Sequence, residues 1–357
     1  MTDWDSYPED YRRDEITQIL AAVRAGESVA IIGLSGAGKS NLLGFLRNRA
    51  PEFPGELVLA DCNRLEDRSP EALWRLISSA MGAPLPPGAG LSSLEELVSE
   101  RLGAKESSLC LLLDRFDVLT EAPNPALANN LRVLRDAHRY RLTYVAATRR
   151  PIDTSSELAE LFYAHTLWLG PLSPVDAEWN VRRYAARRGL EWGREDADAL
   201  VNISGGYASF LRAACEAYAG GASLELEALS GHPAVRRRLD EFWLDEPNEA
   251  ALEASGISGL PLLYAGRAPQ FDTTKFTAKE QLLFDFLHDH SGQMCAKDAL
   301  IRAVWPEDKI YDAGVRDDSL AQLVRRLRVK IEVDPADPQK IKTIPGRGYI
   351  YNPGSVD

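Results

Sequence analysis

One short segment constrains the fold of this chain more than any other: Gly33-Leu-Ser-Gly-Ala-Gly-Lys39-Ser40, in which glycines precede a lysine and a serine. An apolar, strand-like run (Val29–Ile32) leads into it, and residues 41–49 follow with leucines on one helical face. Glycines allow successive backbone N–H groups to turn inward around an anion, and the start of a helix adds the positive end of a dipole. The segment therefore predicts a strand–loop–helix unit that binds phosphate.

The residue types in this loop also predict what the phosphate belongs to. Lys39 supplies a mobile positive charge for β- and γ-phosphates, and Ser40 offers a hydroxyl ligand to Mg²⁺. We therefore expect a nucleoside triphosphate or diphosphate with Mg²⁺ as the cofactors. The residues expected to contact the nucleotide are Gly33, Ser35, Gly36, Ala37, Gly38, Lys39, Ser40 and Asn41.

A second buried strand, residues 109–113, ends in Asp114. A carboxylate at that position would hold Mg²⁺ through water, opposite Ser40. Arg115 follows it, so Asp117 is the nearby carboxylate that could orient an attacking water, unless it simply caps a helix. We therefore expect slow hydrolysis, in which the nucleotide marks a state more than it supplies energy. The expected catalytic residues here are Lys39, Asp114 and Asp117.

Short apolar runs alternate with helical patterns up to residue 171, which is typical of a parallel sheet whose strands are connected by helices. Arg149 follows the fourth run and could reach the γ-phosphate of its own site or of a neighbouring copy, as a further catalytic residue. The alternative for Arg149 is a solvated surface side chain. Strands are predicted at residues 28–32, 56–60, 109–113, 142–147 and 166–169, and residues 174–240 are helical throughout.

The C-terminal part combines three helical patterns with a hairpin. Thr277 and Glu280 have capping-box spacing at the start of the first helix. The second helix is predicted at residues 297–305 and the third from about Asp318. Alternating apolar residues around a Gly-Arg-Gly turn predict a hairpin at residues 340–351, which we call the wing.

Charge and composition limit the partners. The formal net charge of −12 argues against a chain that coats nucleic acid along its whole surface. Residues 325–347, however, hold seven basic and three acidic side chains, so DNA contact is expected there, within residues 316–350. No apolar run approaches the roughly 20 residues that span a bilayer. Four scattered cysteines and a polar N-terminus complete the prediction of a cytoplasmic protein without a membrane partner.

Residues 10–232 resemble the nucleotide-binding module of the STAND class of P-loop ATPases, which is close to the origin-recognition AAA+ ATPases. The resemblance rests on a leading helix from Tyr11, on GLSGAGKS, LCLLLDRFD and VAATRR, and on a Gly-Gly turn at residues 204–209. It implies a switch that is closed with ADP and open or oligomeric with ATP. Two positions depart from the family: Arg115 replaces a water-orienting Glu, and Ala208 replaces a Pro that contacts nucleotide.

Residues 276–352 resemble the winged helix-turn-helix of OmpR/PhoB-type response regulators. In that family the third helix enters the major groove and the wing lies near the minor groove. The resemblance implies DNA binding through Arg325, Arg326, Arg328, Thr343 and Arg347. The alternative is a winged helix that binds protein.

Together these features predict an α/β P-loop NTPase, with helices on both faces of a parallel sheet, joined to an all-α lid and a winged helix-turn-helix domain. The expected function is an ATP-dependent switch whose nucleotide state controls a DNA-binding winged helix. The alternatives are an oligomerising signalling or defence ATPase whose winged helix binds protein, and a DNA-loading, initiator-type ATPase. Besides nucleotide and DNA, the partners considered are further copies of this chain in a nucleotide-dependent homo-oligomer, or another protein. The expected domains are residues 1–172 (core), 173–232 (lid), 233–274 (connector) and 275–357 (winged helix).

Overall fold

The structure is a computed structural model that describes residues 3–49, 53, 55–103, 107–121, 124–265, 273–305, 313–332, 335 and 337–352. The chain divides into two compact units, Met1–Asp176 and Ala177–Asp357, each of which is described by itself. In the described part of the chain, none of the helices is both long enough and apolar enough to cross a membrane.

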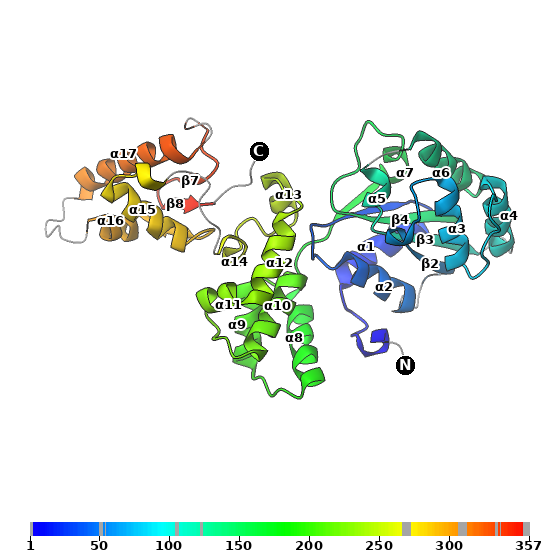
Figure 1. Cartoon of the computed structure of the whole chain (residues 1–357), viewed down its shortest axis with the longest axis horizontal. Coiled ribbons are helices and arrows are strands. Elements are labelled where there is room, and N and C mark those ends of the chain that lie inside the picture. Colours follow the sequence, from blue (N-terminus) through cyan, green and yellow to red (C-terminus); the bar gives the residue numbers. More distant parts are fainter. Residues whose placement is uncertain are drawn as a thin grey trace. The chain divides into compact units, whose positions relative to one another are not determined.

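A parallel sheet forms the centre of the first unit (Figure 1). Its strands follow the spatial order β2-β3-β4-β1-β5, and each pairs in parallel with its neighbours. The expected strands are confirmed, with ends that differ by at most one residue. Their bounds are β1 (Val29–Ile32), β2 (Gly55–Asp61), β3 (Ser108–Asp114), β4 (Leu142–Thr148) and β5 (His165–Trp168).

Helices cover both faces of this sheet because its strands are apolar on both sides. Alternate residues of β3 and β4, such as Leu111 and Tyr144, form one core cluster with three longer helices and two single-turn helices. Two further helices lie against the strands from the other face. The first group is α3 (Pro70–Ala80), α4 (Leu91–Leu102) and α6 (Pro125–Ala137), and the second is α1 (Arg13–Arg24) and α2 (Lys39–Arg49). Shorter elements are η1 (Asp3–Ser6), η2 (Cys62–Arg64), α5 (Asp117–Thr120) and α7 (Ala159–Phe162).

The strand order decides where a ligand can bind. The chain leaves β1 toward β2, at one edge of the sheet, and leaves the neighbouring β4 toward β5, at the other edge. In open α/β sheets such a reversal leaves a crevice at the carboxyl ends of the strands, which is where ligands bind. The glycine-rich loop and the end of β4 therefore meet at the expected place.

The second unit begins with helices. They are α8, which starts in the first unit, then α9 and α10, followed by α11 to α14. Gly205 and Gly206 join α9 to α10 with left-handed φ angles of 58° and 69°, which glycine adopts most readily. The bounds are α8 (Pro174–Arg188), α9 (Arg194–Ser204), α10 (Ala208–Ala219), α11 (Leu226–Gly231), α12 (Pro233–Trp243), α13 (Glu249–Ala254) and α14 (Pro261–Tyr264).

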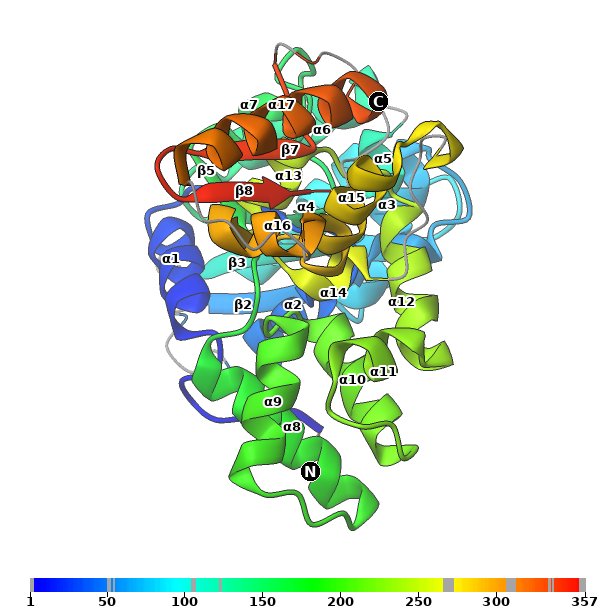
Figure 2. The ribbon, with the colours of Figure 1, turned by 90° about the vertical axis from the view of Figure 1, so that its left-hand side faces the viewer.

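The C-terminal residues form a winged helix with an antiparallel sheet of order β6-β8-β7. Figure 2 shows its hairpin running alongside α17. The third helix begins at Ala313, five residues before the expected start, and β6 was not predicted because a three-residue strand carries little pattern. The elements are η3 (Thr273–Lys275), α15 (Ala278–Asp289), β6 (Met294–Ala296), α16 (Lys297–Val304), α17 (Ala313–Ile331), β7 (Ile341–Ile344) and β8 (Gly348–Tyr351).

An ion pair between a buried carboxylate, Glu280, and the half-buried Lys330 fixes the base of this domain. The capping box is present, and the backbone N–H of Thr277 donates to Glu280 Oε2 at 2.8 Å. Lys330 Nζ, from the last turn of α17, donates to the same oxygen at 2.5 Å and to the carbonyl of Lys275 at 2.8 Å. The pair therefore joins the start of α15 to the end of α17.

Candidate phosphate-binding site and nucleic-acid interface

The glycine-rich loop follows β1 and turns tightly into α2. Gly36 and Gly38 have φ angles of 82° and 99°, a left-handed region that side chains with a Cβ rarely adopt. A Cβ on Gly33 would lie 3.2 Å from the Cβ atoms of Ala37 and Leu169, so the loop is also closely packed. Such conformations allow successive backbone N–H groups to turn toward one anion, as binding of a phosphate requires.

Polar side chains lie within the loop and directly after it. The Lys39 ammonium donates to the carbonyl of Gly33 and, at 3.4 Å, to that of Leu34, so it lies across the loop. Ser35 is half-buried, and Ser40 is exposed at the first turn of α2. The Asn41 side chain accepts from the Tyr7 hydroxyl and donates to the Tyr11 hydroxyl, both at 3.2 Å. The Asn41 side chain thus holds the segment that precedes α1.

Asp114 lies at the carboxyl end of β3, as its position in the sequence predicts. Its carboxylate is buried, and Oδ1 accepts from the backbone N–H of Arg115 at 2.9 Å. Arg115 has a left-handed φ of 52°, and its guanidinium lies 4.0 Å from Asp61, which is opposite Asp114 in the β2–β3 register. Because β1 and β3 run parallel in one sheet, Asp114 and the loop both lie where the strands have their carboxyl ends, which we call the carboxyl edge of the sheet.

Asp117 and Arg149, both expected to be catalytic, are bound to each other. Asp117 Oδ1 accepts from the backbone N–H of Arg149 at 2.5 Å, and its Oδ2 lies 3.7 Å from Arg149 Nε. The Arg149 guanidinium also donates to Glu121 at 3.2 Å. The structure therefore gives both side chains a structural contact between the end of β4 and the start of α5.

One polar group at this edge was missing from the residues expected at the site. Thr148 ends β4 and is 0% exposed, and within the described residues its hydroxyl has no hydrogen-bond partner. Its carbonyl accepts from the backbone N–H of Gly33 at 3.0 Å, so it adjoins the first residue of the loop. The signal that could have found it is a hydroxyl at the end of an apolar strand.

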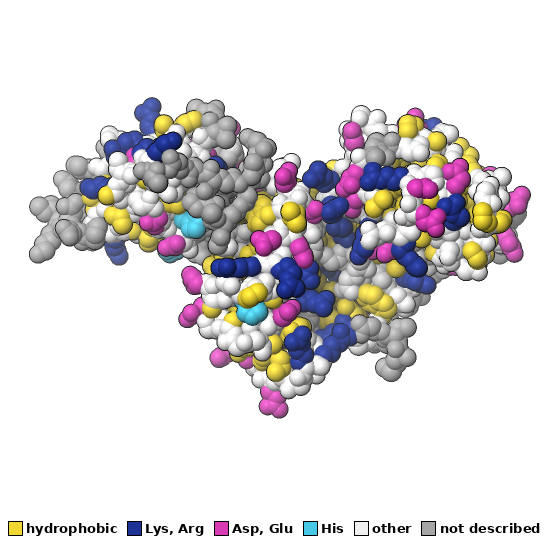
Figure 3. Space-filling view, in the orientation of Figure 1, with side chains coloured by type: hydrophobic (Ala, Val, Ile, Leu, Met, Phe, Trp, Pro, Cys, Tyr) yellow, Lys and Arg dark blue, Asp and Glu magenta, His cyan; other side chains and the backbone are white. Residues whose placement is uncertain are grey.

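The three helix arginines of the winged helix have different surroundings. Arg325 and Arg326 are exposed on α17, where basic side chains gather (Figure 3). Arg328 is half-buried: its Nε and Nη2 donate to the carbonyl of Ile341 at 3.0 and 2.6 Å, and Nη2 donates to the Thr343 hydroxyl at 2.8 Å. Arg328 and Thr343, both expected to bind DNA, therefore join α17 to β7.

The tip of the wing is a tight turn. The backbone N–H of Arg347 donates to the carbonyl of Ile344 at 3.0 Å, with Pro345 and Gly346 between them. Gly346 has a φ of 72°, as the third position of a type II turn requires. The Arg347 side chain is exposed. A basic side chain thus lies at the turn that forms the tip of the wing.

Comparison with known families assigns both ends of the chain. The family described as "AAA domain" matches residues 23–149, which contain the phosphate loop, Asp114 and Arg149. The family described as "Transcriptional regulatory protein, C terminal" matches residues 272–351. The chain joins an AAA domain to a transcriptional-regulator domain. The predicted P-loop core and winged helix-turn-helix are thereby confirmed.

Individual relatives match parts of the chain or its whole length at low identity. The sensory transduction protein RegX3 of Mycobacterium tuberculosis is 38% identical over 78 residues, 22% of this chain and 33% of RegX3. The chain thus spans one third of the length of the curated relatives it matches. Among solved structures, ORC2 of Aeropyrum pernix (ADPNP–ADP complexes) is 15% identical, with 96% of this chain and 90% of that chain covered and a TM-score of 0.47. CDC6P of Pyrobaculum aerophilum is 14% identical, with 98% and 92% covered and a TM-score of 0.48.

Proposed function

We propose that this protein is a nucleotide-controlled DNA-binding regulator. ATP or ADP with Mg²⁺ binds at the AAA domain, and the bound state changes how the regulator domain binds DNA. The observation that carries the proposal is the presence of two elements in one chain. One is a phosphate loop in which Gly36 and Gly38 have left-handed φ angles. The other is a winged helix on which Arg325 and Arg326 are exposed.

The residues at the sheet edge fit a nucleoside triphosphate. Backbone N–H groups of the loop and the Lys39 ammonium would hold phosphate oxygens, and Ser40 with Asp114 would hold Mg²⁺. Bound Mg²⁺ would neutralise charge on the phosphates. The unpartnered hydroxyl of Thr148, beside Gly33, is placed to donate to a γ-phosphate oxygen or to a water next to it, and this would distinguish ATP from ADP.

The same geometry supports slow hydrolysis. An efficient ATPase needs a group that orients the attacking water. Asp117, the carboxylate expected to do so, already accepts from the backbone and lies near the guanidinium of Arg149. Arg115 follows Asp114 directly and cannot act as a base. The bound nucleotide would therefore persist long enough to define a state.

Binding of DNA is proposed for the exposed face of α17 and the tip of the wing. Arg325 and Arg326 stand in the part of α17 that would lie along a groove, and Arg347 would lie at the neighbouring backbone. Arg328 and Thr343 would contribute by holding the wing against α17. If about three basic groups meet phosphates, the logarithm of the affinity falls against the logarithm of salt with a slope of about −2.7.

The test is a salt-graded DNA-binding assay on the full chain without nucleotide, with Mg-ADP and with a non-hydrolysable Mg-ATP analogue. We expect the two nucleotides to give affinities that differ by at least about fivefold, the lower end of ordinary allosteric coupling. Lys39→Ala should remove this difference. Arg47→Ala, which removes an exposed positive charge from the same helix α2, should leave it intact.

Each contrary result has a definite meaning. Equal DNA affinities with bound ADP and bound ATP analogue would refute the switch. No DNA binding at about 50 mM salt would instead favour a winged helix that binds protein, and nucleotide-dependent sedimentation would then identify an oligomerising ATPase. Hydrolysis that DNA strongly stimulates would favour a DNA-loading, initiator-type ATPase.

A further inference from the structure

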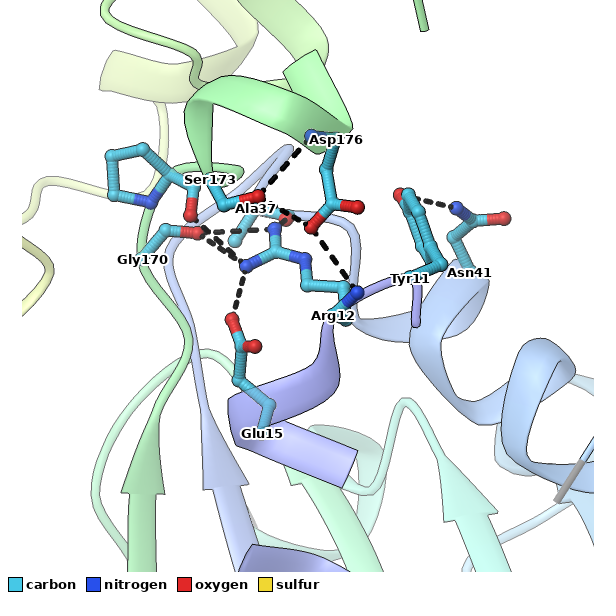
Figure 4. Close-up of polar contacts among 9 residues, drawn as sticks. Tyr11, Arg12, Glu15, Ala37, Asn41, Gly170, Ser173 and Asp176 are labelled. Carbon is cyan, nitrogen blue, oxygen red and sulfur yellow. Dashed lines mark hydrogen bonds and ion pairs between the residues drawn. The ribbon is translucent and has the colours of Figure 1, made fainter. Parts of the chain in front are cut away.

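A buried arginine that the expected site did not include lies beside the phosphate loop (Figure 4). Arg12, immediately before α1, is 2% exposed and has a left-handed φ of 53°. That conformation costs free energy for a residue with a Cβ, and burial of a guanidinium costs more. A conformation with both costs persists only where the surrounding contacts hold the residue in it.

The contacts of Arg12 join segments that are far apart in the sequence. Its Nη2 donates to the carbonyls of Ala37 and Gly170, both at 3.1 Å. Its Nη1 donates to the carbonyls of Gly170 and Pro171, both at 3.1 Å, and to Glu15 at 2.6 Å. One planar group therefore binds the phosphate loop and the segment that follows β5.

The contact with Ala37 bears on phosphate binding through the geometry of the peptide. The carbonyl of Ala37 and the N–H of Gly38 belong to one peptide group, and no described peptide bond is cis. In a trans peptide the C=O and N–H point in opposite directions. By holding the Ala37 carbonyl on one side, Arg12 sets the direction of the Gly38 N–H on the other, within the loop that would hold the phosphates.

The backbone of Arg12 contacts the start of α8. The backbone N–H of Arg12 donates to Asp176 Oδ2 at 3.1 Å, and the Ser173 hydroxyl donates to the same oxygen at 2.8 Å. Asp176 lies in the first turn of α8 and is buried. The division between the two compact units falls directly after it. Arg12 thus contacts the segment through which the chain leaves the first unit.

We propose that Arg12 is a positioning residue that couples the phosphate loop to residues 170–176, so that a change in the Ala37 peptide on nucleotide binding is transmitted to the start of α8. This inference rests on the proposed function and names the first step of the switch. An arginine suits the role because its planar fork of five N–H donors can hold several carbonyls in fixed directions at once. Lysine keeps the charge but has a single nitrogen.

Hydrogen–deuterium exchange of the full chain tests the coupling without nucleotide. In Arg12→Lys we expect the amides of residues 34–38 and of residues 170–176 to exchange at least about tenfold faster, since both segments are deprived of hydrogen bonds to a charged group. Arg13→Lys, the same change at the exposed neighbour, should alter neither segment. Faster exchange in only one of the two segments, or in neither, would overturn the coupling.

A second variant covers the case in which Arg12→Lys does not fold. Ser173→Ala removes one donor to Asp176 and leaves Arg12 in place. We expect it to speed exchange at residues 170–176 and, to a smaller degree, at residues 34–38. Unchanged exchange at residues 34–38 alongside a clear effect at residues 170–176 would overturn the coupling by this route.

Mg-ATP analogue is then added to separate the two proposals. The wild-type chain should bind it and change its exchange at residues 170–176, and Arg12→Lys should bind it at least about tenfold more weakly and lack that change. A wild-type chain that binds no nucleotide would refute the proposed function and the transmitted signal with it. An Arg12→Lys chain that binds the analogue and keeps the full change at residues 170–176 would refute the coupling alone.

Discussion

At the scale of single residues, Thr148 combines a buried, unsatisfied hydroxyl with the nucleotide-sensing role proposed above. A buried hydroxyl without a partner costs about 1–3 kcal/mol, and such groups call for an explanation when they occur. The hydroxyl stands at the carboxyl end of β4, the central strand, beside the first residue of the phosphate loop. Thr143, near the other end of the same strand, is buried too but its side chain is hydrogen-bonded to Cys110. The unsatisfied group is therefore specific to the end of the strand.

Thr148→Val should separate stability from nucleotide recognition. Because valine has nearly the same shape and no hydroxyl, we expect the free energy of unfolding to stay constant or rise by about 1 kcal/mol. The preference for ATP over ADP should fall. Thermal unfolding and nucleotide titration of the full chain measure the two effects.

Thr143→Val is the matched control on the same strand. It should lower stability by about 1 kcal/mol, because it removes a hydroxyl that is hydrogen-bonded, and leave nucleotide preference unchanged. If Thr148→Val proves as destabilising as Thr143→Val, the hydroxyl of Thr148 has an internal partner and the interpretation is wrong.

At the scale of elements, the arginines of α17 show how helical period divides one basic run between two roles. Val324 and Leu327 face the domain core, and Arg328 is next to that face, which brings its guanidinium to β7. Arg325 and Arg326 lie on the opposite, exposed side. The run therefore contains two candidates for contact with DNA and one residue that holds the wing.

The two roles predict that mutation affects DNA binding in one case and stability in the other. Arg325→Ala with Arg326→Ala should weaken DNA binding and make the salt slope shallower by about 0.9 for each phosphate that the protein no longer neutralises, with unchanged thermal stability. Arg328→Ala should lower the stability of the winged helix by about 1–3 kcal/mol, because it removes the hydrogen bonds from the guanidinium to β7. Fluorescence anisotropy with labelled DNA and thermal unfolding measure both. Abolished DNA binding in Arg328→Ala at unchanged stability would contradict this division.

The junction of α15 and α17 predicts a pH dependence. Burial of Glu280 opposes its ionisation, but the Lys330 ammonium and Thr277 outweigh this, and the pKa of Glu280 is lowered below its ordinary value of 4.5. A lowered pKa means that the unfolded chain binds the proton more readily, so the stabilisation is complete above about pH 4.5 and disappears as the pH falls through the lower folded value.

Glu280→Gln should therefore destabilise the winged helix at pH 7, and its difference from the wild type should shrink below about pH 4.5. Exchange rates of residues 275–281 between about pH 3 and 7, corrected for intrinsic exchange, measure it. Asp289→Asn, at the exposed end of the same helix, is the control and should show no comparable trend. A difference that stays constant down to about pH 3 would show that the Glu280 charge does not contribute.

At the scale of the whole molecule, the acidic and the basic parts of the chain belong to different domains. The AAA domain lies in the acidic first part, and the basic segment at residues 325–347 lies in the regulator domain. A ligand shifts a conformational equilibrium only by its different affinities for the two states. In the proposed switch, Arg12 matters because it is bound to Asp176, directly before the point where the two units divide.

Much of the fold and part of the site could be predicted because their signals are local. The phosphate loop, the five strands and the capping box of α15 each follow from residues within a few positions of one another. Asp114 followed in the same way, from a carboxylate at the end of an apolar strand. The third helix was expected too short, since its first turn lacks the apolar spacing that marks the rest.

Other parts of the site depend on contacts that no local pattern encodes. Asp117 meets Arg149 across 32 positions because β3 and β4 are neighbours in the sheet. Arg328 and Arg12 bond mainly to backbone carbonyls, at Ile341 and at Ala37, Gly170 and Pro171. Every residue has a carbonyl, so such a partner leaves no mark on the sequence. The amino-acid order alone thus determined which groups could bind phosphate and DNA, and folding in three dimensions decided which charged side chains stay exposed and which hold the protein together.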